Sequence, residues 1–408
     1  MGDLLWPGDE RAGELFGQPA LLAAMVRVEA AWLAALVEQQ VAPEGAYDDL
    51  TDLVTASDVP LVAEGAGGSG NPVVPLVSLL RDRLQQRNTD AARWLHRGLT
   101  SQDVLDTSLS LCLRDVLDRV AAELATQRTT LVELADAHRE TLMAGRTLTQ
   151  PAVPITFGVK AASWLDGLVD AARSLAEARQ ELPAQLGGAA GTMAAATELA
   201  DVDRAPALVR TTVRRLDLQG GLPWHGNRGR VTRTGDALVR CTDAWGRIAN
   251  DVLTLSRPEL GELSERSGGG SSTMPHKANP VLSVLVRRAA LAGPLTAAQL
   301  HLAAADTADE RPAGAWHLEW SALRDLARRA VVAASQTTDV LTGLQVHPER
   351  MKDNLAAALP GVLAEQRAMA ELVSSDSTDR GTDDDPAGYL GLSSVIIDTA
   401  IERARRQS

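Results

Sequence analysis

Residues 268–280 read Gly-Gly-Gly-Ser-Ser-Thr-Met-Pro-His-Lys-Ala-Asn-Pro, and no other stretch says as much about the fold and chemistry of this chain. The three glycines give a backbone that can adopt positive φ. Pro280 suits the first turn of a helix, and Asn279 suits the N-cap before it. We therefore expect a loop that leads into a helix N-terminus, where free N–H groups and the helix dipole favour an anion.

Two simpler interpretations of this loop have to be weighed, and the residues themselves leave the first of them open. A glycine run is often a flexible linker, and a phosphate-binding loop also begins with glycine. A Gly-Lys-Ser/Thr motif and a preceding buried strand are both absent, which argues against the phosphate loop. Two hydroxyls and one cation, Ser271, Ser272 and Lys277, instead predict chemistry on a carboxylate.

The composition is that of a globular protein with a large negative net charge. The chain has 408 residues, of which 45% are hydrophobic and 23% charged, and it carries a formal charge of −13. This length allows two or three domains. The charge argues against nucleic acid and anionic membranes as partners, and an anionic substrate would need locally concentrated arginine and lysine.

Cysteine content and the N-terminus predict a cytoplasmic location. Cys112 and Cys241 are the only cysteines, so neither a disulfide framework nor a metal-binding spacing follows. The first residues are too acidic for a signal peptide, and we expect no membrane span. No metal or cofactor is expected.

Hydrophobic periodicity predicts long helices and an oligomer. One amphipathic helix is expected at 19–40, and five longer ones at 103–140, 155–182, 232–255, 280–305 and 320–344. Strand signals are few, so the pattern predicts an all-α bundle. Helices of this length carry apolar residues on more than one face, and the second face is expected to pack against another subunit.

The loop resembles the signature of the fumarase/aspartase superfamily, Ser-Ser-x-Met-Pro-x-Lys-x-Asn, and it matches at every fixed position. The resemblance implies an N-terminal helical domain at 1–107, a central bundle at 108–345 and a small C-terminal helical region at 346–408. It also implies a homotetramer in which three subunits build each active site. The resemblance further implies that Ser271 is the general base, with Lys277 stabilising its alkoxide and Ser272 and Asn279 binding substrate.

A second segment, residues 96–107, reads His-Arg-Gly-Leu-Thr-Ser-Gln-Asp-Val-Leu-Asp-Thr. Spacing alone fits a plain capping loop, in which Asp103 caps the first turn of the long helix after it. The superfamily has the same pattern at its fixed positions. The resemblance implies that Thr100 and Ser101 bind a substrate carboxylate and that His96 lies close to the reacting centre.

A third segment, Arg146 to Pro154, is expected to enter the next long helix, which would place Arg146, Thr147 and Gln150 at its N-terminus. An Arg–Thr pair often has only a structural role. The superfamily uses this segment as its third active-site element, and the resemblance raises all three residues as substrate ligands.

Further stretches, among them residues 70–77, 222–228 and 309–320, resemble the 3-carboxy-cis,cis-muconate cycloisomerase family. That family closes a diene tricarboxylate to 4-carboxymuconolactone, in the protocatechuate branch of the β-ketoadipate pathway. A small polycarboxylate is thus the implied substrate. Three negative charges call for several cations, and the candidates are Arg97, Arg146, Arg228 and Lys277.

The chain departs from its relatives in the third segment. Leu148 and Pro151 occupy the two positions where a histidine is customary, so His96 and His225 remain as alternative acids. The departure suggests a second possibility, a lyase that releases fumarate from a substituted succinate such as nitrosuccinate, because a stable anionic leaving group needs no proton. An adenylosuccinate-type elimination fits less well. A non-catalytic homologue is disfavoured by the intact loop.

Overall fold

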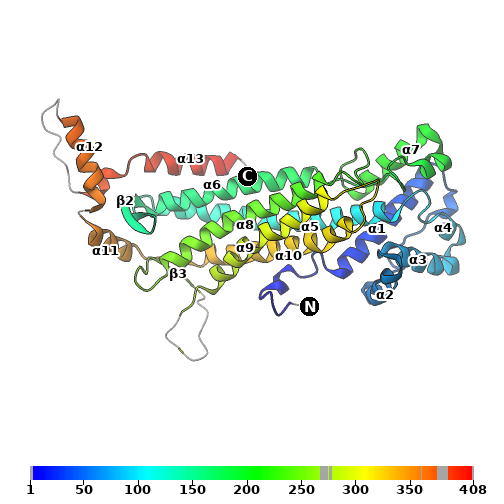
Figure 1. Cartoon of the computed structure of the whole chain (residues 1–408), viewed down its shortest axis with the longest axis horizontal. Helices are drawn as coiled ribbons and strands as arrows, with labels where there is room; N and C mark the ends of the chain where they lie inside the picture. The colour runs from blue at the N-terminus through cyan, green and yellow to red at the C-terminus, as the bar shows by residue number, and fades with distance from the viewer. Residues whose placement is uncertain (1–2, 267–273, 275–277, 360, 375–384, 407–408) are drawn as a thin grey trace. The chain divides into compact units, whose positions relative to one another are not determined.

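The computed structural model describes residues 3–266, 274, 278–359, 361–374 and 385–406, and almost all of its regular structure is helical (Figure 1). The predicted all-α class is confirmed. The helices are α1 (Gln18–Glu38), α2 (Val59–Ser69), α3 (Val73–Arg87), α4 (Thr89–Trp94), α5 (Ser101–Ala137), α6 (Phe157–Gln180), α7 (Ala194–Leu216), α8 (Gly229–Leu255), α9 (Val281–Ala305), α10 (Ala315–Thr342), α11 (Pro348–Ala358), α12 (Ala364–Ser374) and α13 (Ser393–Arg406).

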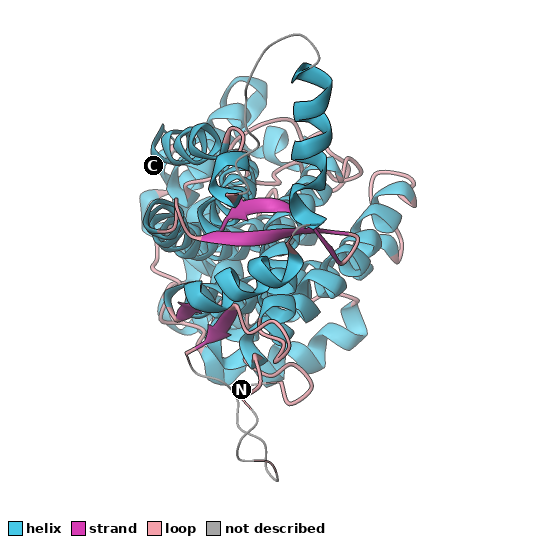
Figure 2. Cartoon of the chain, turned by 90° about the vertical axis from the view of Figure 1, so that its left-hand side faces the viewer, coloured by secondary structure: helices cyan, strands magenta, loops and turns pink. Residues whose placement is uncertain are grey.

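The five predicted long helices correspond to α5, α6, α8, α9 and α10, with ends displaced by a few residues. One further helix, α7, was not anticipated, and it bends at Asp201, whose φ of 67° is left-handed. The described chain also has two small antiparallel sheets of two strands each, drawn in magenta in Figure 2. They pair β1 (Leu142–Thr147) with β2 (Gln150–Thr156), and β3 (Leu263–Glu265) with β4 (Leu344–Val346).

The chain divides into two compact units, each built from three stretches of sequence. The first unit contains residues 1–120, 175–239 and 293–332, and the second contains 121–174, 240–292 and 333–408. Each of the five long helices contributes one part to each unit. The three consecutive regions expected from the sequence, 1–107, 108–345 and 346–408, stay a prediction beside this division.

Within the second unit, polar side chains join the long helices around a buried amide. Gln127 of α5 accepts from Trp245 Nε1 of α8 at 2.8 Å and donates to the Ala334 carbonyl of α10 at 2.9 Å. Trp164 of α6 donates to Asp251 of α8 at 2.8 Å. Buried indole and amide groups are satisfied here by partners on other helices, which fixes how these helix segments pack.

Within the first unit, α8, α9 and α10 come into close contact at a glycine. A Cβ atom at Gly235 would lie 2.6 Å from Leu300 Cδ1 of α9 and 3.6 Å from Leu326 Cδ2 of α10, so a larger residue would require Leu300 to move. The α1 helix packs beside α7 in the same unit, with Gln39 donating to Thr211 at 3.1 Å. The N-terminal segment is tied to α10 through Arg328, which forms an ion pair with Asp9.

The α9 helix exposes an apolar stripe. Five large side chains at helical spacing remain open to solvent: Val281, Val284, Leu291, Leu295 and Leu302. By length and composition alone, α1 and α9 could also span a membrane, which the sequence analysis did not anticipate. The core helices of soluble proteins share this length and composition, and 67% of the most apolar part of α1 is buried inside the protein.

Candidate active site

The N-terminus of α5 is built as its sequence predicts. Thr100 precedes the helix, and its backbone N–H donates to Asp103 Oδ2 at 3.0 Å. Asp103 is fully buried and also accepts from the N–H groups of Gly187 and Gly188, at 2.8 and 2.9 Å. Burial raises the pKa of Asp103 to about 6, against the opposing effect of these N–H groups. The carboxylate thereby fastens the 187–188 loop to the start of α5.

His225 belongs to the same network as a neutral ring. Its Nε2 lies 2.9 Å from the Gly188 carbonyl, and its Nδ1 lies 2.9 Å from the side-chain nitrogen of Gln185. The first contact requires a proton on Nε2 and the second requires none on Nδ1, which assigns the tautomer. Burial also lowers the pKa of His225. Since both ring nitrogens are engaged, His225 is poorly suited to be a proton donor.

His96 is arranged differently. Its Nδ1 lies 2.6 Å from Oε1 of Glu29, a completely buried carboxylate on α1. Burial alone would lower the pKa of His96, but the charge and hydrogen bond of Glu29 outweigh it, so the pKa is raised. No contact to Nε2 is present among the residues the structure describes. Of the two candidate histidines, His96 is therefore the one with a free ring nitrogen.

Three arginines lie around this segment without a close ion pair to a carboxylate in the described part of the chain. Arg311 donates to Thr100 Oγ1 at 2.6 Å, Arg97 to the Arg93 carbonyl at 2.8 Å, and Arg81 to the Leu95 carbonyl at 3.0 Å. Arg97 is close enough to lower the pKa of Arg81, although burial has the larger effect. The result is surplus positive charge beside Thr100 and His96.

Two of the four cations expected to bind substrate have protein partners instead. Arg228 is 2% exposed and is held between Asp106 at 2.7 Å and Glu319 at 2.6 Å. Arg146 forms a two-point pair with Glu262, at 2.6 and 2.9 Å, and Glu262 is itself fully buried. Both guanidinium groups are neutralised in this structure, so they hold helices and strands in place rather than offer charge to a ligand.

The expected helix N-terminus at Arg146 is in fact a β-hairpin. Thr147 and Gln150 face each other in the β1–β2 register, and the turn between them has positive φ at Leu148 and Thr149, 49° and 73°. The turn is exposed, with Leu148 at 96%. The three predicted residues therefore divide: Thr147 and Gln150 flank the exposed tip, whereas Arg146 is directed to Glu262.

The start of α9 also differs from expectation. The helix begins at Val281, one residue later than predicted, and its cap is Glu265 rather than Asn279. Glu265 accepts from the N–H groups of Leu282 and Ser283, at 3.2 and 2.8 Å. The protein's own carboxylate thus occupies the helix terminus expected to attract the substrate. Three predicted residues, Ser271, Ser272 and Lys277, lie outside the described residues.

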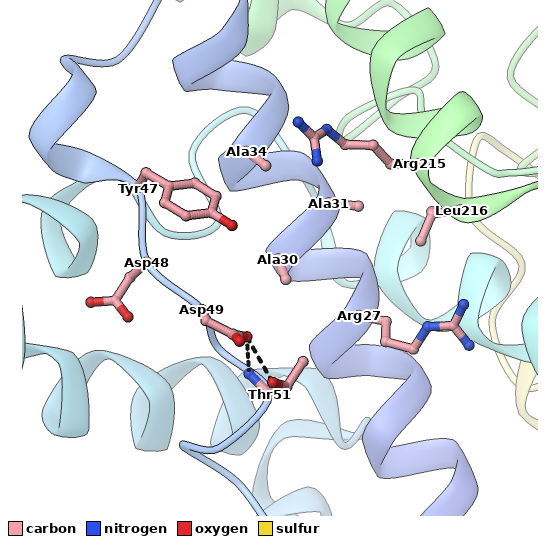
Figure 3. Close-up of a pocket in the computed structure, with 10 residues that line it drawn as sticks. All are labelled: Arg27, Ala30, Ala31, Ala34, Tyr47, Asp48, Asp49, Thr51, Arg215 and Leu216. Carbon is pink, nitrogen blue, oxygen red and sulfur yellow. Dashed lines mark hydrogen bonds between the residues drawn. The ribbon is translucent and has the colours of Figure 1, made fainter.

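The structure brings His96, Thr100 and Ser101 together in the first unit. Arg228 belongs to the same unit and is joined to α5 by its ion pair with Asp106. Arg146, Thr147, Gln150 and Asn279 belong to the second unit. A hollow of about 190 Å³ on the first unit lies between α1 and the 47–51 segment (Figure 3). It is lined by Arg27, Tyr47 and Arg215 and contains none of the predicted residues.

Sequence reasoning missed Glu29 and Arg311. Glu29 had a recognisable signal, since it stands four residues after Met25 and three before Trp32, at the helical spacing of the apolar face. Arg311 lay in a segment quoted only for its resemblance. Together, the four residues place an imidazole and a guanidinium beside the start of α5, and a carboxylate can accept hydrogen bonds from groups of this kind.

Comparison with known proteins shows the family to which the chain belongs. The family described as Lyase matches residues 22–292. Nitrosuccinate lyase of Streptomyces davaonensis is 38% identical, covering 91% of this chain and 90% of that protein. The 3-carboxy-cis,cis-muconate cycloisomerase of Bradyrhizobium diazoefficiens is 36% identical, covering 84% of this chain and 76% of that protein.

The fold comparison agrees. The crystal structure of 3-carboxy-cis,cis-muconate lactonizing enzyme from Pseudomonas putida superimposes with a TM-score of 0.85 at 31% identity, covering 97% of each chain. The fumarate lyase structure from Mesorhizobium gives a TM-score of 0.79 at 27% identity, over 96% of this chain and 97% of that one. The chain therefore belongs to the fumarase/aspartase superfamily of lyases.

Proposed function

We propose that the protein is a 3-carboxy-cis,cis-muconate cycloisomerase. The observation that carries the proposal is the group of arginines, Arg81, Arg97 and Arg311, that surrounds the His96–Thr100 segment without a close ion pair to a carboxylate in the described chain. Unpaired cations in a protein of net charge −13 fit a substrate with several negative charges. Matches to four cycloisomerases at 34–36% identity support the assignment.

The reaction is an internal addition. One carboxylate oxygen of the substrate forms a bond to one carbon of a C=C double bond. The π electron pair of the double bond then moves through its other carbon onto a second carboxylate. A proton then joins the adjacent carbon, so that no atom is lost. Orientation and charge neutralisation supply most of the acceleration. Thr100, Ser101 and Arg311 hold the carboxylate that takes up charge, and Ser271, activated by Lys277, exchanges the proton.

The hairpin tip fits this chemistry. Leu148 and Pro151 offer no proton to a departing group. In the reverse direction of the cycloisomerase reaction the departing group is a carboxylate, which leaves as an anion and needs none. Fumarase- or adenylosuccinate-type eliminations expel oxygen or nitrogen groups that do need a proton. Ligand roles for Ser272, Asn279, Thr147 and Gln150 remain part of the proposal.

A second candidate is a nitrosuccinate lyase. Nitrite also departs as an anion, and the Streptomyces davaonensis enzyme matches this chain over more of its own length than the Bradyrhizobium cycloisomerase does, 90% against 76%. The product would then be fumarate. Neither candidate requires a metal or a cofactor for its charge stabilisation.

We further propose a cytoplasmic homotetramer with active sites shared between subunits. The exposed apolar stripe on α9 supports this assembly, because large apolar patches on a protein surface usually mark an interface. Sharing would also explain why predicted site residues are distributed over both units of one chain.

A substrate panel tests the proposal. Purified protein is mixed with 3-carboxy-cis,cis-muconate, and loss of diene absorbance and appearance of lactone are followed. In parallel, nitrosuccinate and other substituted succinates are offered and fumarate is measured. We expect lactone formation to dominate by kcat/KM. Fumarate from nitrosuccinate with no lactone would assign the second function, and turnover of neither would contradict both.

A further inference from the structure

Among the side chains that α1 buries, one is charged. Glu29 is completely enclosed in a helix whose other buried residues are apolar. A buried carboxylate is unfavourable unless a charged or hydrogen-bonding partner compensates it. The partner is His96, whose Nδ1 lies 2.6 Å from Oε1 of Glu29, a length typical of a charge-assisted hydrogen bond.

The α1 helix also holds the backbone around His96. Trp32 lies one helical turn after Glu29 and donates its Nε1 to the Arg97 carbonyl at 2.7 Å. From α3, Arg81 donates to the Leu95 carbonyl at 3.0 Å. These two carbonyls flank His96, whose φ of 61° is left-handed. Such a conformation is strained for a residue other than glycine and persists only where surrounding contacts enforce it.

Stability alone does not account for Glu29. Its second oxygen, Oε2, is buried without a hydrogen-bond partner among the described residues, and such oxygens are rare because they lose their solvation. An apolar side chain would avoid this cost in the interior of α1. A strained histidine and an under-satisfied carboxylate that meet at one contact are typical of a functional site.

We infer that Glu29 is a positioning residue that holds His96 as an imidazolium, with Nδ1 toward α1 and Nε2 toward the substrate. The inference rests on the proposed function for the last step alone. There, the Nε2–H donates a hydrogen bond to the carboxylate that gains charge as the carbon–oxygen bond forms. No proton leaves the ring, so the balance of the reaction is unchanged. The hairpin then needs no histidine of its own.

The charged groups that face His96 come from three helices: Glu29 of α1, Arg81 of α3 and Asp103 of α5. Burial and Arg81 lower the pKa of His96, while Glu29 and Asp103 raise it, and the net direction is upward. A raised histidine pKa stabilises the fold fully below the unfolded value, about 6.5, and this contribution disappears as pH rises through the folded value. Removal of the Glu29 charge should therefore move the His96 titration downward.

Histidine NMR on the full-length protein, without substrate, measures that titration. The samples are wild type, Glu29→Gln, the matched control Glu38→Gln elsewhere on α1, and His96→Asn to assign the signal. We expect a wild-type midpoint above about 6.5, lowered by about 1–2 pH units in Glu29→Gln, as for loss of an adjacent opposite charge. Glu38→Gln should leave the midpoint unchanged.

The pH profile of kcat/KM gives the second readout. In Glu29→Gln its alkaline limb should move down by the same interval as the NMR midpoint. The value of kcat should fall about 100-fold with little change in KM, because a misplaced group affects the transition state more than binding.

The two readouts separate this inference from the proposed function. An unchanged His96 midpoint in Glu29→Gln would overturn the inference even if the protein turns over muconate. A lowered midpoint in a protein that acts on no panel substrate would support the pairing and contradict the proposed function. If Glu29→Gln does not fold, the wild-type midpoint decides, and a value at or below about 6.5 would overturn the inference.

Discussion

At the scale of residues, charge pairing decides which arginines can serve the substrate. Arg228 and Arg146 match family patterns in the sequence, yet each faces a carboxylate far away along the chain, Glu319 or Glu262. A pairing over about a hundred residues cannot be read from local spacing, which is why both were expected to bind substrate. Arg311, with no such partner among the described residues, is the better candidate.

Arg311→Lys tests this distinction. Arg311 donates to Thr100 Oγ1 at 2.6 Å, and its planar guanidinium can bind a substrate carboxylate at the same time. Lysine keeps the positive charge but cannot make both contacts. We expect kcat/KM to fall about 10- to 100-fold, chiefly through KM, as for loss of one charged hydrogen bond of about 1.5–3 kcal/mol. Steady-state kinetics measures it. The matched control is Arg93→Lys, an exposed arginine on α4. Equal losses in both variants would argue against a ligand role for Arg311.

At the scale of elements, sequence periodicity predicts helices well and turns poorly. The repeat of leucines from Leu105 to Leu131 is enough to place α5, because only a helix puts leucines at this spacing on one apolar face. The β1–β2 hairpin had no comparable signal. Its two-residue turn, Leu148-Thr149, adopts left-handed φ without the Asn-Gly or Asp-Gly that usually marks such turns.

The exposed stripe on α9 predicts what holds the assembly together. Leu291 is 66% exposed, so Leu291→Glu should change the stability of the single chain by no more than about 0.5 kcal/mol. We expect it instead to dissociate the oligomer, because a buried charge at an apolar interface is unfavourable. The molar mass measured by light scattering and the activity should fall together, while the helix content measured by circular dichroism stays constant.

Val395→Glu provides the control for that experiment, since it makes the same kind of change on α13, where Val395 is 57% exposed. It should keep both mass and activity. If Leu291→Glu eluted as wild type with full activity, the stripe would not be an interface, and each chain would have to complete its own site.

At the scale of the whole molecule, the sequence is enough to predict the superfamily, whereas the structure is needed to find which charged residues pair with one another. The signature at Ser271–Asn279 and the family pattern at residues 96–107 led to the correct superfamily. The pairings that decide charge, Glu29 with His96 and Glu262 with Arg146, appear only when helices and strands separated in sequence are brought together. Buried carboxylates were therefore the main feature that the sequence concealed.

The central claim is that this enzyme moves a proton at carbon next to a charge-stabilised carboxylate, with the Ser271 hydroxyl as the exchanging group. The most direct measurement runs 3-carboxy-cis,cis-muconate to product in D₂O and reads the lactone by NMR and mass spectrometry, for wild type and for Ser271→Ala. We predict one deuterium at the carbon beside the newly formed carbon–oxygen bond in wild type, and a loss of turnover of about 100-fold or more in Ser271→Ala. Lactone without deuterium, or an Ala variant with wild-type turnover, would contradict the account.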